Sequence, residues 1–271
     1  MAQSIRKLIL DMDGVLWRGE TPLGDLPRFF ATLGDLGLGY MLATNNATKT
    51  QEQYVQKLAR FGADIPAGRI LTSAETTGAY LARHYPPGTR VYVVGEKGLR
   101  HALRSRQFSL LEMDGYVSAD TTTDLVVVGF TRETHYPELA NAAVLINRGA
   151  RFIGTNPDKT IPHELGFLPG AGSYLAFFEA ATGREPTIIG KPNRFVFEEA
   201  LRRLDARPEE TAMVGDRIET DILGAGKVGL QTILLMSGVT DEERLATSEV
   251  RPDVVLANIS ALQDYLVDRQ Q

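Results

Sequence analysis

The sequence predicts an α/β protein in which helices flank a parallel β-sheet. Short apolar runs alternate with helical patterns along the 271 residues, and this alternation is typical of strand-helix-strand units. Residues 8–10 are apolar without alternation and lead directly into Asp11 and Asp13. Such a run suits a strand that is buried on both faces, and parallel sheets form their sites at the carboxyl ends of such strands. With 43% hydrophobic residues, the chain can also bury a sizeable core.

Each expected strand is a short apolar run, each expected helix has a helical pattern, and turn residues separate them. The expected strands are short apolar runs at residues 8–10, 40–43, 91–94, 125–128, 151–154, 187–189, 212–214, 231–235 and 254–255. The expected helices occupy intervals between them, at residues 26–36, 50–61, 99–106, 137–147, 173–182, 194–204 and 259–267.

Composition limits the partners of the chain. Its net charge is −5 and it has no cysteine, so it lacks the broad basic surface that binds a nucleic acid polymer, and disulfides and thiolate metal sites are excluded. The apolar run before Asp11 is too short for a signal peptide, and no apolar stretch is long enough for a membrane span. We therefore expect a cytoplasmic protein without a nucleic acid or membrane partner, and a homodimer stays open as its oligomeric state.

Asp11 and Asp13 stand one residue apart after the first expected strand. Two carboxylates so close repel each other unless a cation or a shared proton holds them. A protein that places both carboxylates at the carboxyl end of a strand is therefore expected to use their charge in its function.

A second polar cluster, Thr44-Asn45-Asn46, follows the strand expected at residues 40–43. Thr48 and Gln51 come next, with the spacing of a capping box. A hydroxyl and free backbone N–H groups at the start of a helix can bind an anion. An asparagine-rich turn with an ordinary helix cap is an equal alternative.

Two further polar clusters follow later strands. Lys191 comes after the strand expected at 187–189, within Gly-Lys-Pro, where it would be a fixed positive charge, although a single lysine in a turn is more often solvated. Asp216 and Asp221 follow the strand expected at 212–214. They could serve a metal, or they could be an N-cap and a residue on a helix face.

In this order, Asp-x-Asp-Gly-Val, Thr-Asn, Gly-Lys-Pro and Gly-Asp-x-x-x-x-Asp resemble the motifs of the haloacid dehalogenase (HAD) superfamily of phosphotransferases. The resemblance covers the whole chain. Residues 94–96 (Val-Gly-Glu), 149–158 (Gly-Ala-Arg-Phe-Ile-Gly-Thr-Asn-Pro-Asp) and 169–173 (Pro-Gly-Ala-Gly-Ser) are similar to the NagD or 4-nitrophenyl-phosphatase branch. The resemblance implies a Rossmann-like core and a C2-type cap domain that is inserted after the second motif.

The intervals between the motifs support the same division independently. There are 33 positions from Asp11 to Thr44 and 25 from Lys191 to Asp216, but 147 from Thr44 to Lys191. Because connections in compact domains are short, about 100 residues of that long interval must form an α/β unit of their own. We predict a catalytic core of residues 1–80 and 184–271 and an inserted α/β cap of residues 81–183.

Charge balance agrees with the phosphatase chemistry that the resemblance implies. A phosphate monoester is a dianion, so an attacking carboxylate needs a cation and fixed donors nearby. We expect Asp11 to be the nucleophile that forms an aspartyl-phosphate, and Asp13 to protonate the leaving alkoxide and then deprotonate the attacking water. The resemblance assigns Mg²⁺ to the side chains of Asp11 and Asp216 and to the Asp13 carbonyl, with Asp221 in a supporting place beside these ligands.

The transferring phosphoryl group needs donors of its own, of which Lys191 is expected to act in catalysis as well. The candidate donors are Thr44, Asn45, Asn46, Lys191, Arg217 and Thr220. In the cap, the loop after residues 151–154 resembles the substrate-facing region of the family. Its candidate substrate contacts are Asn156, Asp158 and His163.

The expected reaction is the Mg²⁺-dependent hydrolysis of small phosphate monoesters. The acid at Asp13 distinguishes this chain from dehalogenases, which lack an acid there, and from ion pumps, which carry a threonine. A phosphomutase, which uses the same pair of carboxylates, stays open, as does a catalytically inactive metal-binding regulatory scaffold. The candidate substrates are nucleotide monophosphates, phosphoglycolate, sugar phosphates, pyridoxal phosphate and nitrophenyl phosphate.

Residues 224–229, Gly-Ala-Gly-Lys-Val-Gly, match the dinucleotide-binding pattern in letters only. They end an expected helix and precede a strand, which is the reverse of the order that a pyrophosphate loop requires. We predict a helix end followed by a tight turn.

Overall fold

The computed structural model describes residues 5–163 and 165–269. The Cα positions divide the chain into two compact units. The first unit comprises residues 1–44, 51–71 and 191–271, and the second comprises residues 45–50 and 72–190. These limits fall at 71/72 and 190/191, against the predicted domain limits at 80/81 and 183/184. The functional division of the chain stays a prediction.

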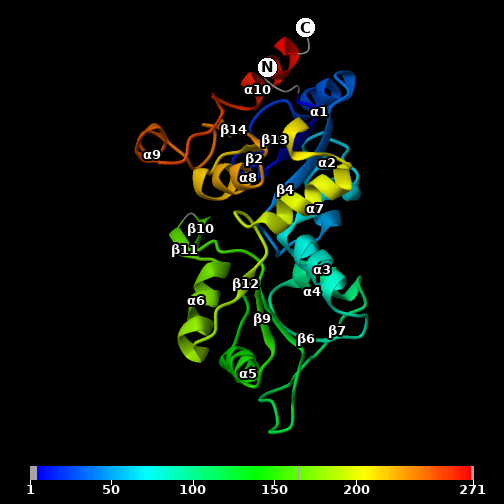
Figure 1. Ribbon diagram of the computed structural model, residues 1–271, viewed down its shortest axis with the longest axis vertical. Helices are drawn as coiled ribbons and strands as arrows, with labels where there is room; N and C mark the ends of the chain where they lie inside the picture. The colour runs from blue at the N-terminus through cyan, green and yellow to red at the C-terminus, as the bar shows by residue number, and fades with distance from the viewer. Residues whose placement is uncertain (1–4, 164, 270–271) are drawn as a thin grey trace. The chain divides into compact units, whose positions relative to one another are not determined.

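The first unit contains a six-stranded sheet in the order β15-β14-β13-β1-β4-β5, part of which is labelled in Figure 1. The strands are β1 (Lys7–Leu10), β4 (Gly39–Thr44), β5 (Ile70–Thr72), β13 (Thr211–Gly215), β14 (Gln231–Leu235) and β15 (Val254–Leu256). β1 pairs in parallel with both β13 and β4, and β14 pairs in parallel with β13 and β15. The carboxyl ends of β1, β4 and β13 therefore lie at one edge of the sheet.

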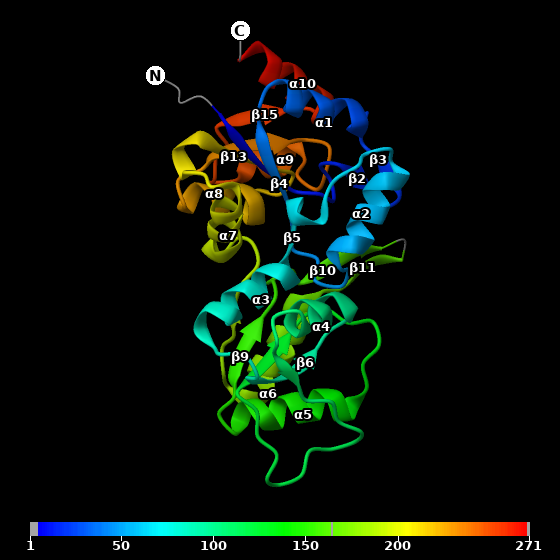
Figure 2. The ribbon, with the colours of Figure 1, turned by 90° about the vertical axis from the view of Figure 1, so that its right-hand side faces the viewer.

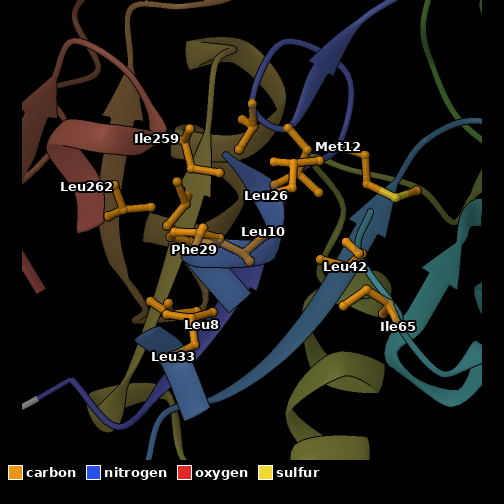
Figure 3. Packing of buried hydrophobic residues seen from close by; sticks show 14 of the residues in the cluster. Leu8, Leu10, Met12, Leu26, Phe29, Leu33, Leu42, Ile65, Ile259 and Leu262 are labelled. Atoms are coloured by element: carbon orange, nitrogen blue, oxygen red, sulfur yellow. The ribbon is translucent and has the colours of Figure 1, made fainter. Parts of the chain in front are cut away.

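Helices cover both faces of this sheet. The helices of the first unit are α1 (Leu26–Asp35), α2 (Gln51–Arg60), α7 (Arg194–Leu204), α8 (Leu223–Lys227), α9 (Glu242–Thr247) and α10 (Ile259–Asp268). Figure 3 shows Leu8 and Leu10 of β1 beside Phe29 of α1 and Leu262 of α10. Ile9 points to the opposite face and packs in a cluster with α7 and α8. β1 is thus buried on both faces, as its unbroken apolar run predicts.

Short elements complete the first unit. A hairpin of β2 (Trp17–Arg18) and β3 (Thr21–Pro22) follows the first strand, and a π-helix spans Ile218–Ile222. Single 3₁₀ turns lie at Ala67–Arg69 and Pro208–Glu210. Gly229 has a φ of +80° between α8 and β14, so the predicted helix end and tight turn at residues 224–229 are confirmed.

The second unit contains a five-stranded sheet in the order β12-β9-β8-β6-β7, in which all neighbours are parallel. Its strands are β6 (Arg90–Val94), β7 (Ser109–Leu110), β8 (Leu125–Val128), β9 (Arg151–Gly154) and β12 (Thr187–Ile188), with an antiparallel hairpin of β10 (Thr160–His163) and β11 (Gly166–Pro169). Its helices are α3 (Ser73–His84), α4 (Lys97–Arg104), α5 (Tyr136–Asn147) and α6 (Ala171–Thr182). Helices α5 and α6 cover one face of the sheet, and Figure 2 shows α3 beside α4.

The nine predicted strands and seven predicted helices are all present within a few residues, and the predicted α/β class is confirmed. Helix α3 was missed, and the predicted limit at residue 81 falls inside it. Its first turns are rich in Ser, Thr and Gly, which favour helices weakly. The structure supports them locally: Thr72 Oγ1 accepts a hydrogen bond from Glu75 N at 3.0 Å, and Thr77 Oγ1 donates to Ser73 O at 2.7 Å.

Among the described residues, no helix combines the length and apolar character needed to cross a bilayer. The cytoplasmic location stays a prediction.

Candidate active site

Three buried acidic side chains meet at the carboxyl edge of the sheet in the first unit. Asp11 directly follows β1 and Asp216 directly follows β13, and these strands are parallel neighbours. Asp221 lies five residues further on, in the π-helix. Carboxylate oxygens of the three residues lie within 4.8 Å of one another. The structure thus brings together Asp11, Asp216 and Asp221, which are three of the four predicted acids.

Lys191 supplies the positive charge in this cluster. Its Nζ lies 2.6 Å from Asp11 Oδ1 and 2.7 Å from Asp221 Oδ1, and it donates to the carbonyl oxygen of Ala43 in β4 at 3.1 Å. Burial by itself lowers the pKa of Lys191, but the charges of the two carboxylates outweigh it, and the pKa lies above its ordinary value. Lys191 is 2% exposed, so the alternative of a solvated lysine is wrong.

The two carboxylate oxygens of Asp216 have different environments. Val239 N donates to Asp216 Oδ2 at 2.7 Å. Gly14 and Gly238 approach the carboxylate so closely that a Cβ on either residue would overlap it. Asp216 Oδ1 is buried and has no hydrogen-bond partner in the described part of the chain. Burial, followed by the charges of Asp11 and Asp221, raises the pKa of Asp216 to about 8.

The cluster carries more negative charge than Lys191 can balance. Burial raises the pKa of Asp11 and of Asp221 even though Lys191 acts in the opposite direction. Buried carboxylates without a partner are costly, and a bound cation removes that cost. Mg²⁺ binds through oxygen ligands from a few carboxylates together with water and phosphate. The donor set, with the open Oδ1 of Asp216, therefore fits this ion.

Asp13 has a different environment from Asp11. Its side chain is exposed, whereas Asp11 is buried, and it is not part of the three-carboxylate cluster. Asp13 Oδ1 accepts a hydrogen bond from Trp17 Nε1 at 2.8 Å. An exposed carboxylate next to a buried one can exchange a proton with water or a ligand.

The other predicted residues of the first unit lie near the same edge. Thr44 is the last residue of β4 and is buried, and β4 is the parallel neighbour of β1. The backbone N–H of Arg217 donates to Asp221 Oδ2 at 3.1 Å, so this N–H is used inside the turn. Thr220 lies half-buried in the π-helix.

In the second unit, two of the three predicted cap residues contact Asn45. The side chain of Asn156 is buried, and its Nδ2 donates to the carbonyl oxygen of Asn45 at 2.7 Å. Asn45 Nδ2 donates to Asp158 Oδ1 at 3.1 Å, and Asp158 N donates to Asn156 Oδ1 at 3.1 Å. Gly190 faces the same residues, and a Cβ there would approach Asn45 Oδ1 at 2.7 Å. His163 is the last residue of β10, and its side chain lies outside the described part of the structure.

The predicted capping box is wrong. Helix α2 begins at Gln51, whose Nε2 donates to the carbonyl oxygens of Ala67 and Ile70. Asn46 Oδ1 accepts hydrogen bonds from both Thr48 N, at 2.8 Å, and Thr48 Oγ1, at 2.7 Å. Asn46 therefore forms a local turn, and anion binding by this cluster stays a prediction.

Several residues of the site escaped the sequence analysis. Trp17, Gly14, Gly238 and Val239 all contact the predicted acids. Gly14 carried a signal, because its φ of +89° suits the glycine directly after Asp13. Gly238 and Val239 come from a loop that is remote in sequence, and no local pattern identifies them.

Comparison with known proteins gives one consistent family. Residues 8–109 match the family model of haloacid dehalogenase-like hydrolases, and residues 188–262 match a HAD-hydrolase-like model. The chain is 39% identical over 256 residues to dihydroxyacetone phosphatase of Corynebacterium glutamicum. The match covers 94% of this chain and 90% of that protein.

Two further relatives match nearly the whole chain. Ribonucleotide monophosphatase NagD of Escherichia coli is 34% identical over 96% of this chain and 98% of its own, and its solved structure matches with a TM-score of 0.85. The structure of glycerol phosphate phosphatase from Mycobacterium tuberculosis in complex with magnesium is 31% identical, with a TM-score of 0.85, and covers 96% of this chain and 77% of that chain. The chain therefore belongs to the haloacid dehalogenase-like hydrolases, in the NagD-like branch whose members join a catalytic core to a cap domain.

Proposed function

We propose that this hydrolase cleaves small phosphate monoesters in a Mg²⁺-dependent reaction with an aspartyl-phosphate intermediate. The observation that carries the proposal is the position of Lys191 Nζ, within 2.7 Å of both Asp11 and Asp221, whose carboxylates lie within 4.8 Å of that of Asp216. A fixed cation next to a carboxylate nucleophile is what attack on a phosphate dianion requires. The phosphatase names of full-length relatives support the same reaction class.

In the first step, a carboxylate oxygen of Asp11 forms a bond to phosphorus while the bond to the leaving oxygen breaks. Asp13 gives its proton to that oxygen, so the leaving group departs as an alcohol. In the second step, water attacks the phosphorus of the aspartyl-phosphate, and Asp13 takes a proton from the water. The bond between phosphorus and the Asp11 oxygen breaks, inorganic phosphate leaves, and both side chains return to their starting states.

Lys191 has two tasks in this scheme. Its charge stabilises the ionised form of Asp11, which is the nucleophilic form, and it also stabilises negative charge on the transferring phosphoryl oxygens. Thr44 and the amide of Asn45, which follows Thr44 in the chain, are the proposed further donors. The backbone between Arg217 and Thr220 would add contacts through the N–H groups that follow Arg217, since the N–H of Arg217 itself is donated to Asp221.

Asp11 and Asp216, with the carbonyl of Asp13, would hold Mg²⁺, and Asp221 would support them through Lys191 and the Arg217 N–H. When bound, the ion neutralises carboxylate and phosphoryl charge. The residues themselves hold the nucleophile in place and keep water from the buried side of the cluster.

We propose that the second unit is the cap and that it recognises the part of the substrate to which the phosphate group is attached. The relatives differ in the phosphate ester that their names give, so we assign only the class of small phosphate monoesters. Because Asn156 and Asp158 hydrogen-bond Asn45, we propose that these two act on the substrate through Asn45. His163 stays the predicted contact to the leaving group.

Two experiments test this function against its alternatives. Wild-type protein should release inorganic phosphate from 4-nitrophenyl phosphate with Mg²⁺, should lose that activity in excess chelator and should regain it when Mg²⁺ is restored. Asp11→Asn should remove turnover by several orders of magnitude, while Asp35→Asn, an exposed acid in α1, should behave as wild type.

Each alternative predicts a different result. A regulatory scaffold would show no phosphate release under any metal condition. A phosphomutase would move phosphate between two positions of a sugar phosphate faster than it releases phosphate to water. Full activity after verified metal removal would reject the proposed mechanism itself.

A further inference from the structure

Trp17 contacts the carboxylate of Asp13 in the first unit. Trp17 Nε1 donates to Asp13 Oδ1 at 2.8 Å, across four residues of sequence. Within the described part of the chain, no other hydrogen bond reaches this carboxylate. Trp17 is fully buried, and a buried indole N–H needs an acceptor. One atom of Trp17 therefore sets the position of one oxygen of Asp13.

The indole ring is itself held on several sides. It stacks on Tyr54 with ring centroids 6.2 Å apart, and it packs against Phe61 at 5.9 Å. Lys57 Nζ lies 4.6 Å from the ring centroid and donates to the carbonyl oxygen of Gly19 at 2.6 Å. The cation on the face of the ring adds an attraction to that of the packing. The indole N–H therefore has a fixed direction.

The backbone between the two residues is fixed as well. Gly14 N donates to the carbonyl oxygen of Trp17 at 2.7 Å, and Leu16 N donates to that of Met12 at 2.8 Å. Asp13 and Trp17 also form an isolated backbone bridge. The turn that joins the carboxylate to the indole is thus closed by hydrogen bonds independent of the side-chain contact.

We propose that Trp17 is a positioning residue for the proton transfer by Asp13, because its N–H occupies Oδ1 and leaves Oδ2 as the oxygen that gives and takes the proton. An N–H donor needs an oxygen that carries a free lone pair, and the protonated oxygen of a carboxylic acid is a poor acceptor. Oδ2 is therefore the oxygen that gives a proton to the leaving oxygen in the first step and takes one from water in the second. This inference rests on the proposed function, in which Asp13 is the general acid and base.

The leaving group of the substrate separates this role from a purely structural one. An alkoxide leaving group needs a proton when its bond to phosphorus breaks, whereas 4-nitrophenolate departs as a stable anion. Loss of proton transfer therefore slows alkyl phosphates much more than 4-nitrophenyl phosphate. Loss of folding or of Mg²⁺ binding slows both substrates alike.

The experiment removes the N–H and keeps the aromatic ring. In Trp17→Phe, kcat/KM for an alkyl phosphate that the wild type hydrolyses should fall about tenfold to a hundredfold, and that for 4-nitrophenyl phosphate by less than about threefold. Asp13→Asn should show the same dependence on the leaving group. The double variant should lose little more than Asp13→Asn alone, because both changes remove one function.

A second substitution covers the case in which Phe at position 17 destabilises the protein. Trp17 is the only tryptophan of the chain, so global replacement of tryptophan by β-(3-benzothienyl)alanine changes this site alone and exchanges the N–H for a sulfur atom. The same dependence on the leaving group is expected, with a melting temperature close to that of the wild type.

A third measurement needs no turnover. Because Trp17 is the sole tryptophan, the intrinsic fluorescence of the protein reports on the indole beside Asp13. Asp13→Ala, which removes the acceptor, should change the emission of the folded protein, whereas Asp35→Ala, at an exposed acid elsewhere in the first unit, should leave it unchanged.

The outcomes separate this inference from the proposed function. Equal losses for both leaving groups, or no loss for either, would overturn the role of Trp17. Unchanged emission in Asp13→Ala would overturn the contact on which it depends. A wild type that hydrolyses neither ester with Mg²⁺ would instead reject the proposed function, and the fluorescence result would still test the contact.

Discussion

Nζ of Lys191 lies 2.6 Å from Oδ1 of Asp11, although 180 residues separate the two along the chain. The same Nζ lies 2.7 Å from Asp221 Oδ1, so a single cation serves two buried carboxylates. Removing one partner of a buried ion pair leaves the other charges without compensation, which costs more than the pair itself contributes. Lys191 is therefore expected to matter for both stability and catalysis.

Lys191→Met keeps much of the side-chain length and removes the charge. We expect kcat/KM to fall by about a hundredfold or more for every phosphate ester and by a similar factor for each, because Lys191 acts on the group that all of them share. The measurement is kcat/KM at saturating Mg²⁺ on at least four esters with unrelated leaving groups.

Lys227→Met is the matched control, since Lys227 is an exposed lysine of α8 in the same unit, and it should behave as wild type. A loss in Lys191→Met that is confined to one ester would place this lysine at the leaving group, against our assignment.

The raised pKa of Asp216 predicts how stability depends on pH. In the folded, metal-free protein the pKa of Asp216 is about 8, whereas an unfolded aspartate titrates near 4. Between these values the folded state holds a proton that the unfolded state has lost, so stability falls as the pH rises through this range. Mg²⁺ binds the ionised carboxylate, and its stabilising effect should therefore grow with pH.

Melting temperatures measured with chelator and with Mg²⁺, at pH values from about 5 to about 9, test this sign. The difference between the two curves should widen toward high pH. Asp216→Asn should flatten both the pH dependence of the metal-free protein and its response to Mg²⁺. A Mg²⁺ effect that is equal at all pH values in the wild type would contradict the assignment of Asp216 as a ligand.

The close approach of Gly238 to Asp216 gives a test of the metal site that changes no charge. A Cβ at position 238 would overlap the Asp216 carboxylate, so Gly238→Ala should displace that carboxylate and weaken Mg²⁺ binding by about tenfold to a hundredfold. Titration of Mg²⁺ by calorimetry measures this directly. Gly226→Ala is the control, because a Cβ there meets nothing within 4 Å, and Mg²⁺ affinity should not change. Equal affinities in the two variants would show that the glycine is not needed.

The strands and most helices could be predicted because each depends on its own residues. The run at Leu8, Ile9 and Leu10 is apolar at every position, and both faces of β1 are buried. The acids that follow β1 and β13 could be predicted to meet, because parallel strands end at one edge. Local pattern and topology are sufficient for these features.

Other features depend on contacts that no local pattern encodes. Helix α3 has little apolar periodicity, and the hydroxyl groups of Thr76 and Thr77 donate to backbone carbonyl oxygens four residues earlier. Val239 reaches Asp216 from 23 residues away, and the connection between β14 and α9 that provides it has no motif. Asp158 was predicted to face substrate from its loop alone, whereas its hydrogen bond to Asn45 spans 113 residues. Such long-range pairs are set by tertiary packing.

Asp158 provides the last test, because its contact predicts a pattern across substrates. Asp158 Oδ1 accepts a hydrogen bond from Asn45 Nδ2 at 3.1 Å, and Asn45 is a proposed donor to the phosphoryl group. If Asp158 acts through Asn45, then Asp158→Ala should lower kcat/KM by a similar factor for all esters and should weaken inhibition by inorganic phosphate. If it contacts the leaving group instead, the ranking of substrates should change while phosphate inhibition stays the same.

We expect the uniform loss, and Asp158→Asn should restore part of the activity, because its carbonyl oxygen can still accept from Asn45. Ser173→Ala is the matched control: Ser173 Oγ donates to the carbonyl oxygen of Lys159 at 2.7 Å, so it supports the same loop without touching Asn45. If Ser173→Ala and Asp158→Ala cause equal losses, then any loosening of the loop is sufficient and Asn45 has no special part. A loss in Asp158→Ala alone, shared by all esters, would place Asp158 with the phosphoryl group.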